Sequence, residues 1–204
     1  MPYLDPTDYA AYGLAAATTD DWIAMASALM DAHCRRPSLR ATEYTERLRI
    51  TPGAQSVRLS YLPLASASSL SAVRVRYGRP RRGELQQDSM LAQVATAFAL
   101  PGSWTTLDPA AVDLNPVTGE VTFPANLLGL NYNEAEITYT AGVSTIPAAL
   151  KIACAQIVRN AQATPALNVK GSRMDTLQMQ YFAGSLIDPN VQKLLAPYVA
   201  QRMG

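Results

Sequence analysis

Two segments whose apolar residues recur at helical spacing stand on either side of a long stretch with a different pattern. In residues 19–36, acidic side chains occupy the first turn, Arg35 and Arg36 the last, and Pro37 follows; this arrangement favours a helix and then ends it. The apolar stripe of this segment is Trp22, Ala26, Leu29, Met30 and His33.

In residues 147–162, Pro147 stands at the first turn, where its missing N–H costs little. The stripe there is Leu150, Ala153, Cys154, Ile157, Val158 and Ala161. We expect two helices that pack on each other.

Between these segments the apolar period shortens to two, which predicts strands. The candidate strands are residues 45–50, 56–61, 71–78, 119–123 and 135–140. Val73 and Val75 alternate with Arg74 and Arg76, so the valines should face a core and the arginines solvent.

Turn residues divide these strands and return the chain to the helices. Thr118-Gly119 has the turn chemistry of a hairpin, and residues 78–102 read as a loop. The Ala141-Gly142 turn then precedes the second helix. We therefore expect a β region inserted between two helices.

The last forty residues have a pattern of their own. Leu177, Met179 and Tyr181 alternate with polar residues, which predicts an amphipathic strand. Asp188 and Pro189 then begin a short helix. A lone strand must pair with something, so it either rejoins the chain's own sheet or extends the sheet of a partner.

The expected fold class is therefore α+β: a helical bundle core, an inserted antiparallel β region and an extended C-terminal arm. The expected boundaries are 1–44 and 141–163 for the helical core, 45–140 for the β region and 164–204 for the arm.

Composition fits one main folded domain in 204 residues, with 49% hydrophobic and 16% charged residues. The net charge of +1 argues against a general nucleic-acid-binding protein. The charges are nevertheless segregated: residues 1–34 carry five Asp and no Lys or Arg, whereas residues 35–86 carry eleven Arg and three Glu. Such segregation is typical either of solvated faces or of subunits that stack through complementary faces.

The sequence contains no signature of an enzyme. Nucleotide-binding glycine motifs, the serine-hydrolase elbow, the HExxH motif and CxxC pairs are all missing. His33 is the sole histidine, and Cys34 and Cys154 lie far apart within expected helices, so neither a metal site nor a disulfide framework is expected. We expect no catalytic, cofactor-binding or metal-binding residues.

No apolar run approaches the roughly 20 residues of a membrane-spanning helix, and the chain reads as intracellular.

Four stretches taken in order carry a resemblance. They are "TTDDWIAMASALMDAHCRRP", "ITYTAGVSTIPAALKIACAQIVRN" at the end of the β region, "KGSRMDTLQMQY" and "DPNVQKLLAPYV". Together they resemble the head-tail connector proteins of tailed bacteriophages and prophages, also called adaptor or head-completion proteins. The motifs are an Ala-Ser-x-x-x-Asp-x-x-Cys helix, a Tyr-Thr-Ala-Gly turn before Ile-Pro, and a short C-terminal helix. The β region is longer here than in the minimal members.

The resemblance implies a structural protein of the virion neck, assembled in the cytoplasm of the bacterial host. Its copies would form a ring, usually a dodecamer, beneath the portal protein, extend the DNA channel and bind a downstream neck or tail protein. The implied portal-docking residues are Met174, Leu177, Met179, Tyr181, Phe182, Leu194 and Leu195. An exposed loop with Arg79, Arg81 and Arg82 would make non-specific contact with packaged double-stranded DNA. No membrane partner is implied.

Three alternatives belong to other classes. A tail-completion protein, such as a stopper or terminator, is the closest competitor, but those proteins tend to lack paired long helices. A nucleic-acid-binding module would use Arg74, Arg76 and the arginines of the loop, yet no series of aromatic residues accompanies them. A small enzyme with an unfamiliar site is the third.

Overall fold

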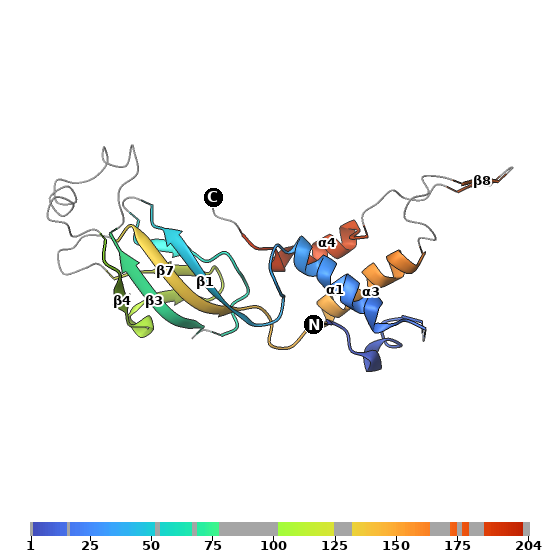
Figure 1. Cartoon of the computed structure of the whole chain (residues 1–204), viewed down its shortest axis with the longest axis horizontal. Coiled ribbons are helices and arrows are strands. Elements are labelled where there is room, and N and C mark those ends of the chain that lie inside the picture. Colours follow the sequence, from blue (N-terminus) through green and yellow to red (C-terminus); the bar gives the residue numbers. More distant parts are fainter. Residues whose placement is uncertain are drawn as a thin grey trace. The chain divides into compact units, whose positions relative to one another are not determined.

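The computed structural model describes residues 2–15, 17–51, 54–66, 69–77, 102–124, 132–163, 172–174, 177–179 and 186–201. The chain forms two compact units (Figure 1). The helical unit consists of Met1–Leu39 and Thr145–Val199, and the β unit is mainly Arg40–Ser144. The fold is mixed α+β with antiparallel sheets, as the sequence predicts.

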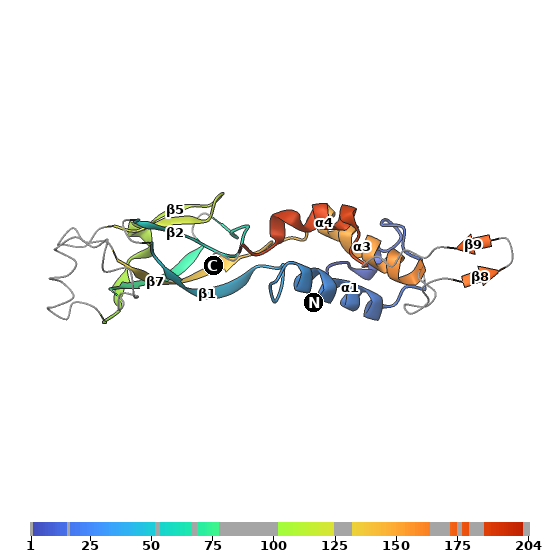
Figure 2. The same ribbon diagram turned by 90° about the horizontal axis from the view of Figure 1, so that it is seen from above.

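In the described residues of the helical unit there are three α-helices. They are α1 (Asp20–His33), α3 (Ala148–Ala163) and α4 (Pro189–Leu195). Short 3-10 helices lie at Pro6–Asp8 and Ala196–Tyr198. Helix α3 packs against both α1 and α4 (Figure 2), so the predicted packing of the two longer helices is confirmed.

The buried face of α1 differs from the predicted stripe by a rotation of the helix. Ile23, Ala26, Ser27 and Met30 are buried, and they recur at the spacing of one helical face. Trp22 is 36% exposed, so its predicted place in the core is wrong. The sequence does not distinguish the two orientations of the helix, because Ile23 and Ser27 share a helical face with Ala26 and Met30 as well as Trp22 does. The Ser27 hydroxyl is buried because it donates to the Ile23 carbonyl at 2.7 Å and accepts from the Tyr3 amide at 3.1 Å.

The buried face of α3 matches the prediction more closely. Leu150, Ala153, Cys154, Ile157 and Val158 are all fully buried. Cys34 and Cys154 are free and buried, and burial raises the pKa of each thiol to about 11. The expectation that both cysteines are core residues is confirmed.

A buried tyrosine joins the N-terminal segment to the end of α1. The Tyr3 hydroxyl donates to the Asp31 carboxylate and accepts from the Leu39 amide at 2.7 Å. Burial, together with the hydrogen bond to Asp31, raises the pKa of Tyr3 to about 12. The hydroxyl is therefore protonated and holds two segments that are distant in sequence.

The described part of the β unit contains two antiparallel sheets. The first has the order β1 (Thr42–Arg49), β7 (Glu134–Ala141), β3 (Leu70–Arg76) and β4 (Thr105–Leu107). The second has the order β2 (Ser56–Arg58), β6 (Glu120–Thr122) and β5 (Asp113–Asn115). A 3-10 helix lies at Pro109–Ala111. Buried side chains from both sheets form one core cluster, including Val73, Ile137, Tyr139, Val57 and Val121. The sheets therefore pack face to face.

All five predicted strands are present, and the structure adds β4 and β5. These two have three residues each, too few to show an alternating pattern. The predicted hairpin at Thr118-Gly119 is confirmed, because β5 pairs with β6 and Asn115 lies opposite Glu120. Gly119 adopts a φ of 69°, a conformation that glycine adopts without strain.

The junction between the units ends strand β7. Gly142 has a φ of 112°, and its amide donates to the Pro63 carbonyl at 2.8 Å. Glycine is required there because L side chains rarely adopt this backbone conformation. The turn therefore stops the alternation of β7 before α3 begins.

The C-terminal segment departs from the expected lone strand. β8 (Ser172–Met174) pairs with β9 (Leu177–Met179) as a two-stranded hairpin, so the strand finds its partner locally. α4 is capped as predicted: the Asp188 carboxylate accepts from the amides of Asn190 and Val191 at 2.9 and 2.8 Å. Within the helical unit, α4 packs on α3.

Candidate functional site

The residues that the resemblance assigns to portal docking lie in different settings. Met174, Leu177 and Met179 belong to the hairpin β8–β9, whose backbone pairs Met174 with Leu177 and Ser172 with Met179. Tyr181 and Phe182 lie outside the described residues. In α4, Leu194 is half-buried and Leu195 is fully buried. Leu195 therefore packs within the helical unit in this structure.

The predicted exposed loop with Arg79, Arg81 and Arg82 lies outside the described residues. The two arginines before it, Arg74 and Arg76, are in β3 and face away from the core, because Val73 and Val75 are fully buried. The predicted alternation of β3 is thus confirmed.

The outer face of the first sheet gathers charged residues from three strands. Glu134 of β7 lies opposite Arg49 of β1 and Arg76 of β3. Two positions along β7, Glu136 lies opposite Arg47 and Arg74 in the same way. The central strand therefore carries the carboxylates and its neighbours carry the guanidinium groups. We call this surface the arginine–tryptophan face, defined as Arg47, Arg49, Arg74, Arg76, Trp104, Glu134 and Glu136.

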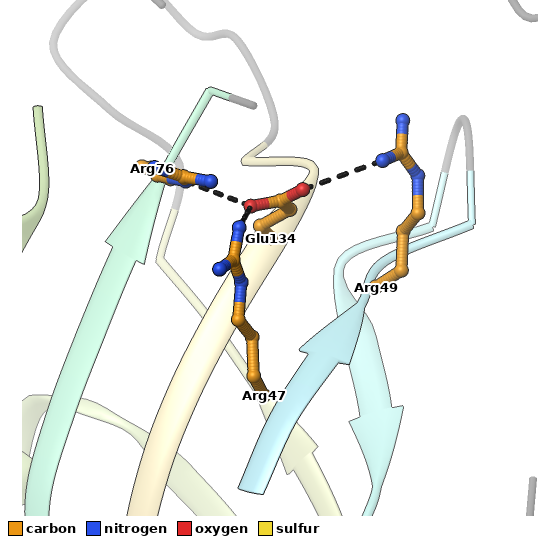
Figure 3. Close-up of polar contacts among 4 residues, drawn as sticks. All are labelled: Arg47, Arg49, Arg76 and Glu134. Atoms are coloured by element: carbon orange, nitrogen blue, oxygen red, sulfur yellow. Dashed lines mark hydrogen bonds and ion pairs between the residues drawn. The ribbon is translucent and has the colours of Figure 1, made fainter. Parts of the chain in front are cut away.

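Three arginines converge on Glu134 (Figure 3). The carboxylate pairs with Arg47 at 2.8 Å, Arg76 at 2.7 Å and Arg49 at 3.3 Å. Partial burial raises the pKa of Glu134, but the hydrogen bonds and charges of Arg47 and Arg76 outweigh it and lower the pKa overall. Glu134 therefore stays ionised and fixes the positions of the guanidinium groups.

Trp104 contacts two of these arginines, and Arg74 as well. The guanidinium carbons of Arg76, Arg47 and Arg74 lie 4.5, 5.4 and 5.6 Å from the centre of its ring, within the range of cation–π attraction. Trp104 just precedes β4, which pairs with β3, and this pairing brings the indole to the arginines. No series of aromatic residues accompanies Arg74 and Arg76 in the sequence, and the single ring of Trp104, which lies far from both in sequence, was not predicted.

A carboxylate also organises the inner side of this sheet. The Tyr139 hydroxyl donates to Glu46 at 2.6 Å and accepts from the Tyr61 amide at 3.1 Å. Burial and the hydrogen bond to Glu46 raise the pKa of Tyr139 well above that of an ordinary tyrosine. This pair is structural, because Tyr139 is fully buried in the core cluster.

Metal-ligating residues are not gathered in the part of the chain that the structure describes: no three His, Cys, Asp or Glu side chains form a group that could hold an ion. Each helix in that same part is too short or too polar to cross a bilayer.

No protein-family model and no curated protein matches the chain. Solved structures similar to it include two from gene transfer agent particles. A chain from the neck of an empty gene transfer agent particle is 16% identical, with a TM-score of 0.45, over 98% of this chain and 91% of that one. A chain from the virion of a native gene transfer agent particle is 15% identical, with a TM-score of 0.48, over the same shares of the two chains. Similarities of this size support no conclusion about the present chain.

Proposed function

We propose that this protein is a structural component of the neck of a phage-like virion, and that it forms the adaptor ring between the portal vertex of the capsid and the tail. In this role it has no catalytic chemistry. It acts by binding copies of itself, the portal protein and a downstream neck or tail protein, and it extends the DNA channel.

The order of the elements carries the proposal. α1 and α3 pack together although a whole β unit separates them in sequence. The stretches that resemble head-tail connector proteins fall on α1, on the passage from β7 through Gly142 into α3, on the hairpin β8–β9 and on α4. Each therefore coincides with an element of the fold, in the order that the resemblance implies.

The proposed portal-docking element is the hairpin β8–β9 with the residues around it. A two-stranded hairpin is marginally stable alone in water, and Ser172–Met174 and Leu177–Met179 form a sheet with no third strand among the described residues. A partner that adds a strand would supply hydrogen bonds and fix the register. Of the other candidate docking residues, Tyr181 and Phe182 adjoin the hairpin in sequence, whereas Leu194 and Leu195 belong to α4.

The ring is proposed to contain twelve copies, as the resemblance implies. The low charged fraction of 16% is consistent with buried contacts between copies. The loop with Arg79, Arg81 and Arg82 is proposed to meet the channel DNA through its phosphates, so this contact would weaken steeply with salt.

The test uses the full chain with the portal protein of the same particle. Electron microscopy of the mixture should show a closed ring seated on the portal. A chain in which residues 170–182 are replaced by a Gly-Ser linker of equal length should fold but fail to co-purify with the portal. The matched control replaces residues 84–96 by a linker of the same length and should still bind.

The possible results distinguish an adaptor from a terminator and locate the portal-docking element. A wild-type protein that ignores the portal but binds the end of a tail tube would be a terminator, and the adaptor role would be wrong. If the ring on the portal still forms after residues 170–182 are replaced but is lost when residues 84–96 are replaced, portal docking belongs to the β unit.

A further inference from the structure

The arginine–tryptophan face is built to meet an acidic surface. It carries four arginines against two glutamates. The side chains of Glu134 and Glu136 are 12% and 29% exposed, and those of Arg49 and Arg76 are 22% and 21% exposed. Arg47 and Arg74 are 54% and 47% exposed. The charge that reaches solvent is therefore positive.

The exposed arginines are held in place before any partner arrives. Arg47 is paired with Glu134 and Arg74 with Glu136, and both guanidinium groups lie over the Trp104 ring. Long side chains lose rotamer freedom on binding, and a group already confined by a ring and a carboxylate loses less of it. The face is therefore better suited to specific docking than a surface of unconfined arginine side chains would be.

The interleaved glutamates decide which kind of anion fits. Phosphates arranged along a nucleic-acid backbone would meet Glu136 between Arg47 and Arg74, the two arginines opposite it in the sheet. A carboxylate there repels a continuous polyanion, whereas a protein surface with separate acidic side chains places them on the arginines alone. A second face of the same kind is excluded as partner, because both would carry excess positive charge.

The helical unit of the same chain offers such an acidic surface. Asp5, Asp20 and Asp21 are exposed. Asp20 accepts from the Tyr9 hydroxyl at 2.7 Å, Asp21 follows it in the first turn of α1, and Asp5 precedes the 3-10 helix Pro6–Asp8 that leads to Tyr9. Asp8, next to them in sequence, pairs with Lys151. Negative charge remains in excess there.

We infer that the arginine–tryptophan face of one copy binds the acidic surface around Asp5, Asp20 and Asp21 on the helical unit of a second copy. Because the two surfaces differ, the contact is heterologous, and it propagates from copy to copy until the assembly closes. The inference rests on the proposed function for the closure of the ring, and names the surfaces that the copies use.

The test is a charge swap in the full chain, read by sedimentation over a range of protein concentrations at low and high salt. Wild type should self-associate, and salt should weaken the association. Arg47→Glu with Arg74→Glu should weaken it about tenfold, as should Asp5→Arg with Asp21→Arg. The chain with all four changes should recover most of the loss. The control, Arg35→Glu with Lys193→Glu, reverses the same number of charges at exposed positions after the C-terminal end of α1 and in α4, and should associate like wild type.

Folding of each variant is checked by circular dichroism. Should the reversed face fail to fold, Arg47→Gln with Arg74→Gln removes the charge without adding carboxylates and should also weaken association. Absence of salt-sensitive association in wild type, or absence of recovery in the fourfold variant, overturns the inference. Saturable binding of a DNA duplex that needs Arg47 and Arg74, with association indifferent to Asp5 and Asp21, overturns it in favour of nucleic acid. If portal-templated rings form equally well with the reversed face, the inference fails while the neck function stands.

Discussion

At the residue scale, Glu134 links the chemistry of the sheet surface to stability. Its carboxylate holds Arg47, Arg49 and Arg76 in one cluster, and these arginines lie on two different strands beside β7. Without the carboxylate, three positive charges from the two strands that flank β7 would lie close together with no negative charge from Glu134 between them, and their repulsion would destabilise the sheet.

The lowered pKa of Glu134 sets the direction of a pH effect. Because the folded state favours the ionised form, the carboxylate stabilises the fold above the ordinary glutamate pKa of about 4.3, and this contribution is lost as pH falls through the folded pKa. We expect Glu134→Gln to be less stable than wild type near neutral pH, and the difference to shrink in acid. Urea denaturation at a series of pH values measures it. A difference that stays constant with pH would show that Glu134 acts by shape alone.

At the scale of one element, the orientation of α1 decides which side chains hold the helical unit together. Ile23 and Trp22 are neighbours in sequence but lie on different faces: Ile23 is fully buried and Trp22 is 36% exposed. Size alone would rank Trp22 first, and burial reverses that order.

Substitutions at these two positions test the orientation. Ile23→Ala should lower the free energy of unfolding by about 2–5 kcal/mol, since it leaves a cavity in a packed core. Trp22→Ala should cost less than about 1 kcal/mol, as is usual for surface positions. Chemical denaturation of both variants is the measurement. Equal losses, or a larger loss at Trp22, would mean that α1 is rotated relative to the orientation described.

At the scale of the whole molecule, the C-terminal region contains two separate elements, the helix α4 and the hairpin β8–β9. A truncation that removes both cannot tell their effects apart. α4 buries Val191 and Leu195 within the helical unit, and Asn160 of α3 donates to Asp188 and to the Leu186 carbonyl. The hairpin β8–β9 precedes these contacts in sequence and makes its pairing locally.

Deleting residues 164–204 should therefore destabilise the helical unit, because it removes the buried side chains of Val191 and Leu195 and leaves part of α3 uncovered. Replacing only residues 170–182 should leave the melting temperature near that of wild type. Thermal unfolding of the two chains, followed by circular dichroism, compares them. A truncated chain as stable as wild type would show that α4 contributes little to the core.

The sequence by itself determined the elements whose signals are local. The helical period of residues 148–158, the alternation of Val73 to Arg76, the Gly119 turn and the Asp188 cap all depend on neighbours a few residues apart. Each therefore appears in the structure near its predicted position. The α+β class followed from them, because a β region between two helices leaves few other arrangements.

Tertiary structure alone decided the arginine–tryptophan face. Arg47, Trp104 and Glu134 are separated by dozens of residues, and they meet because β1 and β3 both pair with β7 while β4 pairs with β3. Strand order and register depend on how a whole sheet covers its core, and no local pattern encodes them. The orientation of α1 was decided in the same way: Trp22 and Ile23 give stripes of equal periodicity, and only packing against α3 selects which of them is buried.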